Sequence, residues 1–136
     1  MKNVQSYLTF NGNCREAMLF YQSCLGGELF IQTIKDSPLS ENMPDNMKEA
    51  VLHSSLTKDD LVILGSDMVG ESGLIRGNAV SMVLNCTDEN ELHDCFQKLA
   101  VDGKVLHPVE TTFFGALLGN LSDRFGNHWM LHYKKA

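Results

Sequence analysis

Residues 4–34 have the sequence VQSYLTFNGNCREAMLFYQSCLGGELFIQTI, and this stretch decides the fold class. β-branched and aromatic residues are frequent in residues 4–10, which predicts a strand, and the polar residues 11–13 mark the turn that ends it. Apolar residues then recur at a spacing that lines one face of a helix. Residues 28–34 resume a strand pattern, so the stretch predicts a strand, a helix and a second strand.

The predicted helix has a start signal and a stop signal. Asn13 can accept hydrogen bonds from the free N–H groups of the first turn, and Glu16 can reach back to complete a capping box. Gly26 and Gly27 follow the last apolar residue, and glycine tolerates the left-handed backbone conformation that commonly ends helices. We therefore expect the helix to lie between these two signals.

The second half of the chain repeats this pattern. Residues 79–86 are apolar and predict a strand, and residues 104–109 predict another. Between these strands, Asp88 is expected to cap a helix, with Glu91 in the capping-box position.

Each half then offers a hairpin. In the first half, residues 51–56 and 61–64 are the expected strands, and in the second half residues 116–121 and 129–133 take that place. Each half therefore reads as one strand, one helix and three strands. One helix can bury only one face of such a sheet, so two halves together predict paired modules with a cavity between them.

The expected organisation is one domain over residues 1–136. Module one covers about residues 1–66, module two about residues 79–136, and a glycine-rich linker of about residues 67–78 joins them. The polar segment 36–49 has no counterpart of equal length in module two.

Composition and charge exclude several classes of function. The chain has 136 residues, with 11 Lys and Arg against 17 Asp and Glu, which gives a formal net charge of -6. Proteins that bind nucleic acids or anionic membrane surfaces usually carry the opposite charge, because they must neutralise phosphates. We therefore expect no nucleic-acid partner and no membrane partner.

The sequence also predicts the compartment. No apolar run approaches the roughly 18 residues that a membrane span needs, and the first residues lack the apolar core of a signal peptide. Cys14, Cys24, Cys86 and Cys95 fit neither a CxxC redox pair nor a zinc knuckle. We expect reduced, buried thiols in a cytoplasmic protein.

Several local motifs carry a family resemblance. Residues 11–17, NGNCREA, are followed by Phe20, Tyr21 and the triplet LGG at 25–27, and residues 123–129 read DRFGNHW. In order and spacing these motifs resemble the vicinal-oxygen-chelate superfamily of glyoxalase I, bleomycin-resistance proteins and extradiol dioxygenases, specifically its PhnB-like branch. The resemblance implies an α+β fold of two βαβββ modules that form a curved mixed sheet around a cup. It also implies a homodimer.

The resemblance also locates the metal ligands of metal-dependent members, which are His, Glu or Gln on the first and last strands of each module. These positions fall near Gln5, Leu64, Ser81 and Met130 in this sequence. Of the four, only Gln5 has a side chain common at such sites, whereas a transition metal needs several converging donors. We therefore expect neither a glyoxalase- or dioxygenase-type metal centre nor another cofactor.

One histidine is the candidate catalytic residue. His53 and Ser55 lie two positions apart in the predicted third strand and therefore on one face. If that face lines the cup, His53 can act as a general base or bind the substrate by a hydrogen bond. The alternative is a structural histidine whose hydrogen bonds are satisfied. His128 and His132, on the last strand, show no convergence with a nucleophile.

The candidate substrate-binding side chains are apolar or carry a hydroxyl group, and they are expected on the face that lines the cup. They are Tyr7, Thr9, Ser55, Leu64, Ser81, Phe114 and Met130. An apolar cavity with few polar groups is typical of a small-molecule site. A filled interior or a dimer contact would use the same residues.

Three functions remain open at this stage. The first is binding of a small organic molecule in the cup without a metal, and the second is a lyase or oxygenase that uses His53. The third is a dimeric structural or regulatory module that makes contacts through a sheet edge and segment 36–49. No glycine-rich nucleotide loop follows a strand, so we expect no methyl-donor site.

Overall fold

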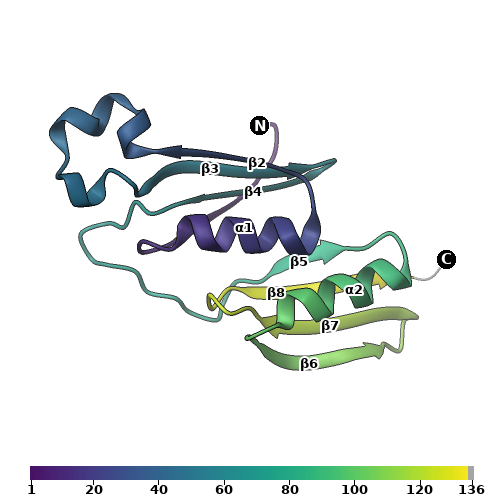
Figure 1. Ribbon diagram of the computed structural model, residues 1–136. Coiled ribbons are helices and arrows are strands. Elements are labelled where there is room, and N and C mark those ends of the chain that lie inside the picture. The colour runs from purple at the N-terminus through teal and green to yellow at the C-terminus, as the bar shows by residue number, and fades with distance from the viewer. Residues whose placement is uncertain (135–136) are drawn as a thin grey trace. The chain divides into compact units, whose positions relative to one another are not determined.

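The computed structural model describes residues 1–134 of the chain (Figure 1). The chain divides into two compact units, Met1–Ile75 and Arg76–Ala136. The prediction that both modules make one domain with a linker at residues 67–78 stays a prediction.

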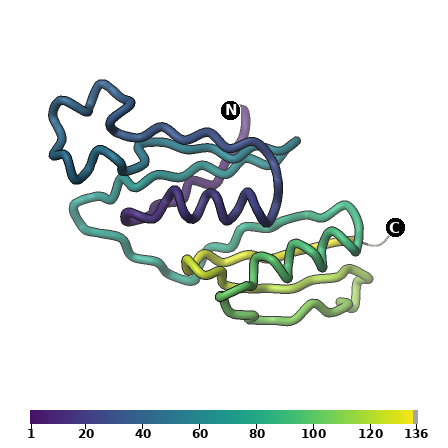
Figure 2. The backbone as a smooth tube through the Cα atoms, in the orientation of Figure 1, coloured from purple at the N-terminus to yellow at the C-terminus, as the bar shows by residue number. Residues whose placement is uncertain are grey.

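The first unit is a four-stranded mixed sheet with one helix. In sheet order the strands are β1, β4, β3 and β2, where β1 runs parallel to β4 and the other pairs are antiparallel. The elements are β1 (Ser6–Thr9), α1 (Cys14–Leu25), β2 (Glu28–Thr33), β3 (Val51–Lys58) and β4 (Leu61–Ser66). Between β2 and β3, three short 3₁₀ helices (Ile34–Asp36, Pro38–Asn42 and Asp45–Met47) form the looped segment at one end of the sheet (Figure 2).

The second unit repeats this topology. Its strands follow the order β5, β8, β7 and β6, and β5 runs parallel to β8. The elements are β5 (Met82–Asn85), α2 (Glu89–Ala100), β6 (Lys104–Thr111), β7 (Ala116–Ser122) and β8 (His128–Lys134). The predicted α+β class with two βαβββ modules is therefore confirmed. Among residues 1–134, no helix is long and apolar enough to cross a membrane.

Each helix covers one face of the sheet in its own unit (Figure 1). In the first unit, the buried face of α1 packs closely because Gly65 has no side chain: a Cβ there would lie 3.2 Å from Met18 Sδ and 3.4 Å from Cys14 Sγ. In the second unit, a Cβ on Gly119 would lie 2.8 Å from the Phe96 ring, which belongs to α2. The buried hydrophobic residues on the helix side include Phe10, Leu56, Ile63, Leu92, Leu99, Leu121, Trp129 and Leu131.

The predicted start signal of α1 is wrong in its capping residue. The Asn13 side chain makes no capping hydrogen bond, and its backbone lacks the extended conformation of a typical N-cap. The Asp67 carboxylate takes this role: Oδ1 accepts hydrogen bonds from Gly12 N at 2.9 Å and Cys14 N at 3.0 Å. Its Oδ2 accepts from Val51 N at 2.9 Å. One carboxylate therefore ties the start of α1 to the start of β3.

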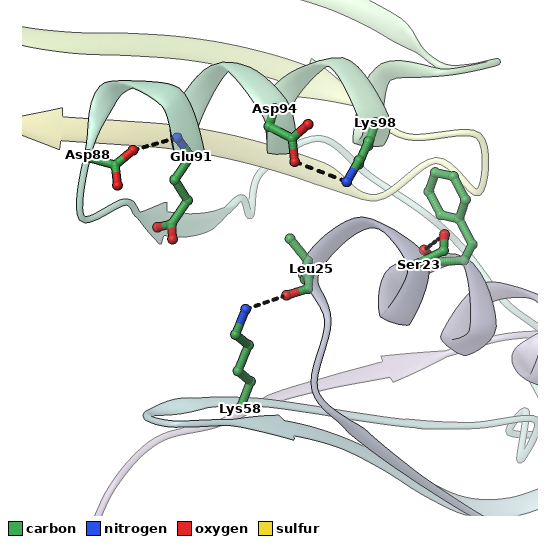
Figure 3. Close-up of polar contacts among 8 residues, drawn as sticks. Ser23, Leu25, Lys58, Asp88, Glu91, Asp94 and Lys98 are labelled. Carbon is green, nitrogen blue, oxygen red and sulfur yellow. Dashed lines mark hydrogen bonds and ion pairs between the residues drawn. The ribbon is translucent and has the colours of Figure 1, made fainter.

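The predicted start of α2 is confirmed (Figure 3). Asp88 Oδ1 accepts a hydrogen bond from Glu91 N at 2.7 Å. Glu91 Oε1 in turn accepts from Thr87 N at 3.0 Å, so both side chains satisfy free N–H groups before and within the first turn.

The end of α1 is also as predicted. Gly26 and Gly27 have positive φ angles of 79° and 103°, which a residue with a Cβ adopts only with strain. A Cβ on Gly27 would also lie 2.6 Å from the carbonyl oxygen of Thr57. Lys58 Nζ donates a hydrogen bond to Leu25 O at 3.1 Å and satisfies a free carbonyl of the last turn (Figure 3).

Three predicted strands are shorter than expected. The strand predicted at residues 4–10 is only Ser6–Thr9. The strand predicted at residues 79–86 is only Met82–Asn85. Within residues 1–134 it pairs with β8 alone, and this pairing begins with Met82 beside Trp129, near the start of β8 at His128, so the residues before Met82 have no neighbouring strand. The strand predicted at residues 28–34 ends at Thr33, where the first 3₁₀ helix begins.

The turn between β7 and β8 is organised by Asp123, a carboxylate that is only 3% exposed. Its Oδ1 accepts hydrogen bonds from Phe125 N and Asn127 N, at 2.8 and 3.1 Å. Its Oδ2 accepts from Trp129 Nε1 at 2.8 Å. The carboxylate therefore holds both the turn and the only tryptophan of the chain.

We expect Asp123→Ala to lower the free energy of unfolding by about 2–4 kcal/mol, because three buried or part-buried N–H groups lose a charged acceptor. Urea unfolding followed by circular dichroism measures this change. Asp94→Ala is the control: its carboxylate is exposed and pairs with Lys98 one helical turn away, so the change should be below about 0.5 kcal/mol. Equal effects of the two substitutions would contradict the role of Asp123.

Candidate functional site

The face of the first sheet away from α1 brings together three of the predicted substrate-binding residues. In the strand register, Tyr7 pairs with Leu64, Leu64 with Ser55 and Ser55 with Phe30. Residues paired in this way point to the same face, so the four side chains form one row across the sheet. Tyr7 and Phe30, at its two ends, are 53% and 57% exposed. The sequence analysis missed Phe30, because only the register of β2 places it in this row.

Thr9 and His53 lie on the same face of this sheet. Thr9 follows Tyr7 by two positions, and His53 precedes Ser55 by two, which keeps each on the open side. His53 pairs with Gln32 in the register and is partly exposed. No hydrogen bond or ion pair among residues 1–134 involves its imidazole. The structure therefore gives His53 access to a ligand but no residue that orients it as a base.

The open face of the second sheet has an equivalent row. Val83 pairs with Met130, Met130 with Asn120 and Asn120 with His107. Met130 therefore lies beside a polar residue that the sequence analysis did not single out. Ser81 was expected on the first strand of this module, but it precedes β5 and is exposed.

A pocket of about 370 Å³ lies in the second unit, along the β6–β7 hairpin. Its lining combines apolar and aromatic residues with a few polar side chains. The residues are His107, Pro108, Glu110, Thr111, Thr112, Phe113, Phe114, Leu118 and Asn120. Phe114 is the predicted substrate-binding residue that this pocket contains.

The turn that carries the two phenylalanines is held by Thr112. Thr112 N donates to Ala116 O at 2.7 Å, and the Thr112 hydroxyl donates to the same oxygen at 3.1 Å. The rings of Phe113 and Phe114 meet edge to face, with centroids 5.1 Å apart. Phe113 is fully exposed and Phe114 is 54% exposed, so both aromatic faces remain available to a ligand.

The pairing of β6 with β7 is irregular beside this turn. Its register with β7 shifts on both sides of His107, and Pro108 within it has no N–H to donate to the sheet. His107 itself lies inside β6. His107 and Glu110 pair with Asn120 and Leu118, so all four lie on the open face.

Asn120 is the least satisfied polar group of this region. Its Oδ1 is buried and has no hydrogen-bond partner. Such an atom is rare in folded proteins and calls for an explanation. The signal in the sequence was a single amide in a strand whose other residues are mostly apolar, ALLGNLS at residues 116–122.

The residues at the family's metal-ligand positions do not fit a metal ion. Leu64 has no donor atom, and Met130 offers only a thioether where the family has His, Glu or Gln. Gln5 is exposed and precedes β1. Within the described residues 1–134, no group of three or more His, Cys, Asp or Glu could hold a metal.

The thiols are buried, as predicted. Burial raises the pKa of Cys14 to about 11, although a contact of 3.5 Å between its Sγ and Ser54 Oγ acts in the opposite direction. Burial also raises the pKa of Cys86 to about 12. A raised pKa keeps the thiol neutral, so neither residue is an activated nucleophile.

A family model described as 3-demethylubiquinone-9 3-methyltransferase matches residues 2–132. The chain belongs to this family. It is 31% identical to Protein YjdN of Escherichia coli strain K12 over 145 residues, which cover 97% of this chain and 95% of that protein. The PhnB-like assignment made from the motifs is therefore confirmed.

Solved structures extend the likeness to the fold. The structure of PA1353 from Pseudomonas aeruginosa has a TM-score of 0.87 and 32% identity, with all of both chains covered. A putative 3-demethylubiquinone-9 3-methyltransferase, PhnB protein, from Bacillus cereus has a TM-score of 0.74 and 30% identity, covering 97% of this chain and 99% of the other. The fosfomycin resistance protein FosX from Listeria monocytogenes, at 12% identity over 99% of this chain and 94% of its own, shares the fold with a TM-score of 0.67. The chain therefore has the vicinal-oxygen-chelate fold.

We expect Cys14 and Cys86 to resist alkylation in the folded protein. A pKa of about 11 in place of the ordinary 9.0 lowers the thiolate fraction of Cys14 roughly 100-fold below pH 9, and burial adds a steric barrier. Iodoacetamide treatment at pH 8 followed by peptide mass spectrometry measures the rates. The same peptides in urea-unfolded protein serve as the control. Fast modification of folded Cys14 would show that its site opens readily.

Proposed function

We propose that this protein binds a small organic molecule without the help of a metal ion. The observation that carries the proposal is the pocket of about 370 Å³ in the second unit. Its volume lies within the range of about 300–1,000 Å³ that is usual for small-molecule sites. Its lining of apolar and aromatic residues with a few polar groups also matches such sites.

The open face of the first sheet supports the same function. Tyr7, Leu64, Ser55 and Phe30 form a row of aromatic, apolar and hydroxyl side chains that the helix of that unit leaves uncovered. We propose that Tyr7, Ser55 and Leu64, with the neighbouring Thr9, are ligand contacts of this unit. Ser81 and Met130 are proposed as contacts of the second unit.

The residues at the family's metal-ligand positions offer too few donor atoms for a metal ion, which supports binding without one.

A contact at the start of the first helix argues against transfer of a methyl group from a nucleotide-like donor. Folds that bind such cofactors use free N–H groups where a strand leads into a helix. In the first unit, the N–H groups of Gly12 and Cys14 at this place already bind the Asp67 carboxylate. A second anion would be repelled there.

An enzyme that uses His53 is the second candidate. The observation in its favour is that His53 lies on the open face, two positions from Ser55 and partly exposed. A lyase or oxygenase reaction would need a partner that orients the imidazole, and a bound substrate would have to supply it.

The homodimer and the cytoplasmic location remain part of the proposal. The open face of the first sheet exposes Tyr7 and Phe30, which a second copy or a ligand could cover. The third hypothesis, a structural or regulatory module, would use segment 36–49, whose 3₁₀ helices expose Leu39 and Met47. Deletion of that segment with loss of the dimer would favour it.

We expect small aromatic fragments to shift amide NMR signals of residues 107–120 and to raise the melting temperature. Phe114→Ala should weaken such binding about tenfold, because a large apolar contact is lost. Leu39→Ala removes an exposed apolar side chain outside the pocket and should leave the affinity unchanged. Fragments that shift only residues of the first unit would show that the site lies there instead.

We expect His53→Gln to change the free energy of unfolding by less than about 1 kcal/mol, because the side chain is partly exposed and makes no hydrogen bond within residues 1–134. Urea unfolding measures the change. A loss above about 2 kcal/mol would indicate the structural histidine considered as the alternative.

A further inference from the structure

The polar groups of the pocket in the second unit point to the charge of its ligand. Among the described residues that line it, none is lysine or arginine, and the one carboxylate belongs to Glu110. Glu110 pairs with Leu118 in the strand register, so it lies on the open face with the rest of the lining. The pocket therefore offers a negative charge and no fixed positive charge.

The second polar feature is an acceptor that lacks a donor. Asn120 Oδ1 is buried without a hydrogen-bond partner, and leaving a buried carbonyl unpaired costs free energy. The hydroxyl of Thr112, which also lines the pocket, already donates to Ala116 O at 3.1 Å. Asn120 as a whole is partly exposed and lines the pocket, so a turn of its side chain would bring Oδ1 to a ligand that carries N–H donors.

The two phenylalanines add a further attraction for a positively charged ligand. Phe114 is 54% exposed and lines the pocket together with Glu110 and Asn120. The face of an aromatic ring carries negative charge density and attracts a cation within about 6 Å of its centre. His107, which pairs with Asn120, adds a further acceptor when its imidazole is neutral.

We infer that the pocket binds an organic amine: a protonated ammonium group attached to an apolar or aromatic body. The ammonium group donates to the Glu110 carboxylate and to Asn120 Oδ1, and the apolar body packs on Phe114 and Leu118. This inference rests on the proposed function and names the class of ligand. The net charge of -6 favours the approach of such a cation over that of an anion.

Three probes with the same phenyl body test the charge preference: phenethylamine, 2-phenylethanol and 3-phenylpropionate. Isothermal titration at pH 7 and low salt gives the affinities, and amide NMR shifts locate the binding. We expect phenethylamine to bind at least tenfold more tightly than 2-phenylethanol and to shift residues 107–120. The propionate should bind most weakly.

Two variants assign the preference to named groups. Glu110→Gln should weaken phenethylamine binding at least tenfold and leave 2-phenylethanol unchanged, and Asn120→Leu should weaken the amine as well. Glu71→Gln is the matched control, because it removes the same charge from an exposed residue outside the pocket and should leave the affinity unchanged. Circular dichroism confirms that each variant is folded.

The outcomes separate the two proposals. If the alcohol or the acid binds in the pocket as tightly as the amine, or if Glu110→Gln and Glu71→Gln have equal effects, the inference about amines is overturned and the proposed function stands. If the three probes and a fragment library shift residues of the first sheet alone, only the inference about amines is overturned. If they shift residues of neither the pocket nor the first sheet, both proposals are overturned.

Discussion

Each sheet of this protein receives one helix from its own unit, and this constraint governs the rest of the structure. The helix must bury the apolar residues of one face, so small residues such as Gly65 and Gly119 stand where it approaches most closely. The other face keeps side chains of mixed character, from Tyr7 in the first unit to Asn120 in the second. The side chains that could bind a ligand or take part in a reaction therefore lie on the sheet faces that the helices leave uncovered.

The sequence predicted the elements whose signals are local. Helical spacing, paired glycines and alternating strands located α1, α2 and both hairpins, and Asp88 with Glu91 marked the start of α2 correctly. The start of α1 was assigned to the wrong residue, because its true partner, Asp67, lies 55 positions after Gly12. A carboxylate that far away leaves no mark in the local pattern.

The site shows the same division. Alternation within a strand placed His53 and Ser55 on one face, and it placed Tyr7 with Thr9. The pairing of residues between neighbouring strands could not be predicted from the sequence, because strand register depends on residues that are distant in the chain. Phe30 and Glu110 were missed for this reason, and Asn120 gained its meaning only when its Oδ1 was found buried without a partner.

Several acidic residues of the chain have a structural role. Asp67, Asp88 and Asp123 accept hydrogen bonds from backbone N–H groups at a helix start or in a turn. Their charges stabilise the architecture and are not all available for recognising partners. Glu110 differs from them, because it lines a pocket and lies on an open face.

The parallel pairing of β1 with β4, and of β5 with β8, has a consequence for the order of folding. In each unit the first strand to be synthesised joins the sheet beside the last, so its contacts close the longest loop of that unit. Closing a long loop costs more chain entropy than forming a hairpin, and contacts of this kind slow folding. The hairpins of β3 with β4 and of β7 with β8 can form early, whereas the short β1 and β5 must wait at the edge. Each module is thus completed by its own first strand, which is synthesised before the strand that it pairs with.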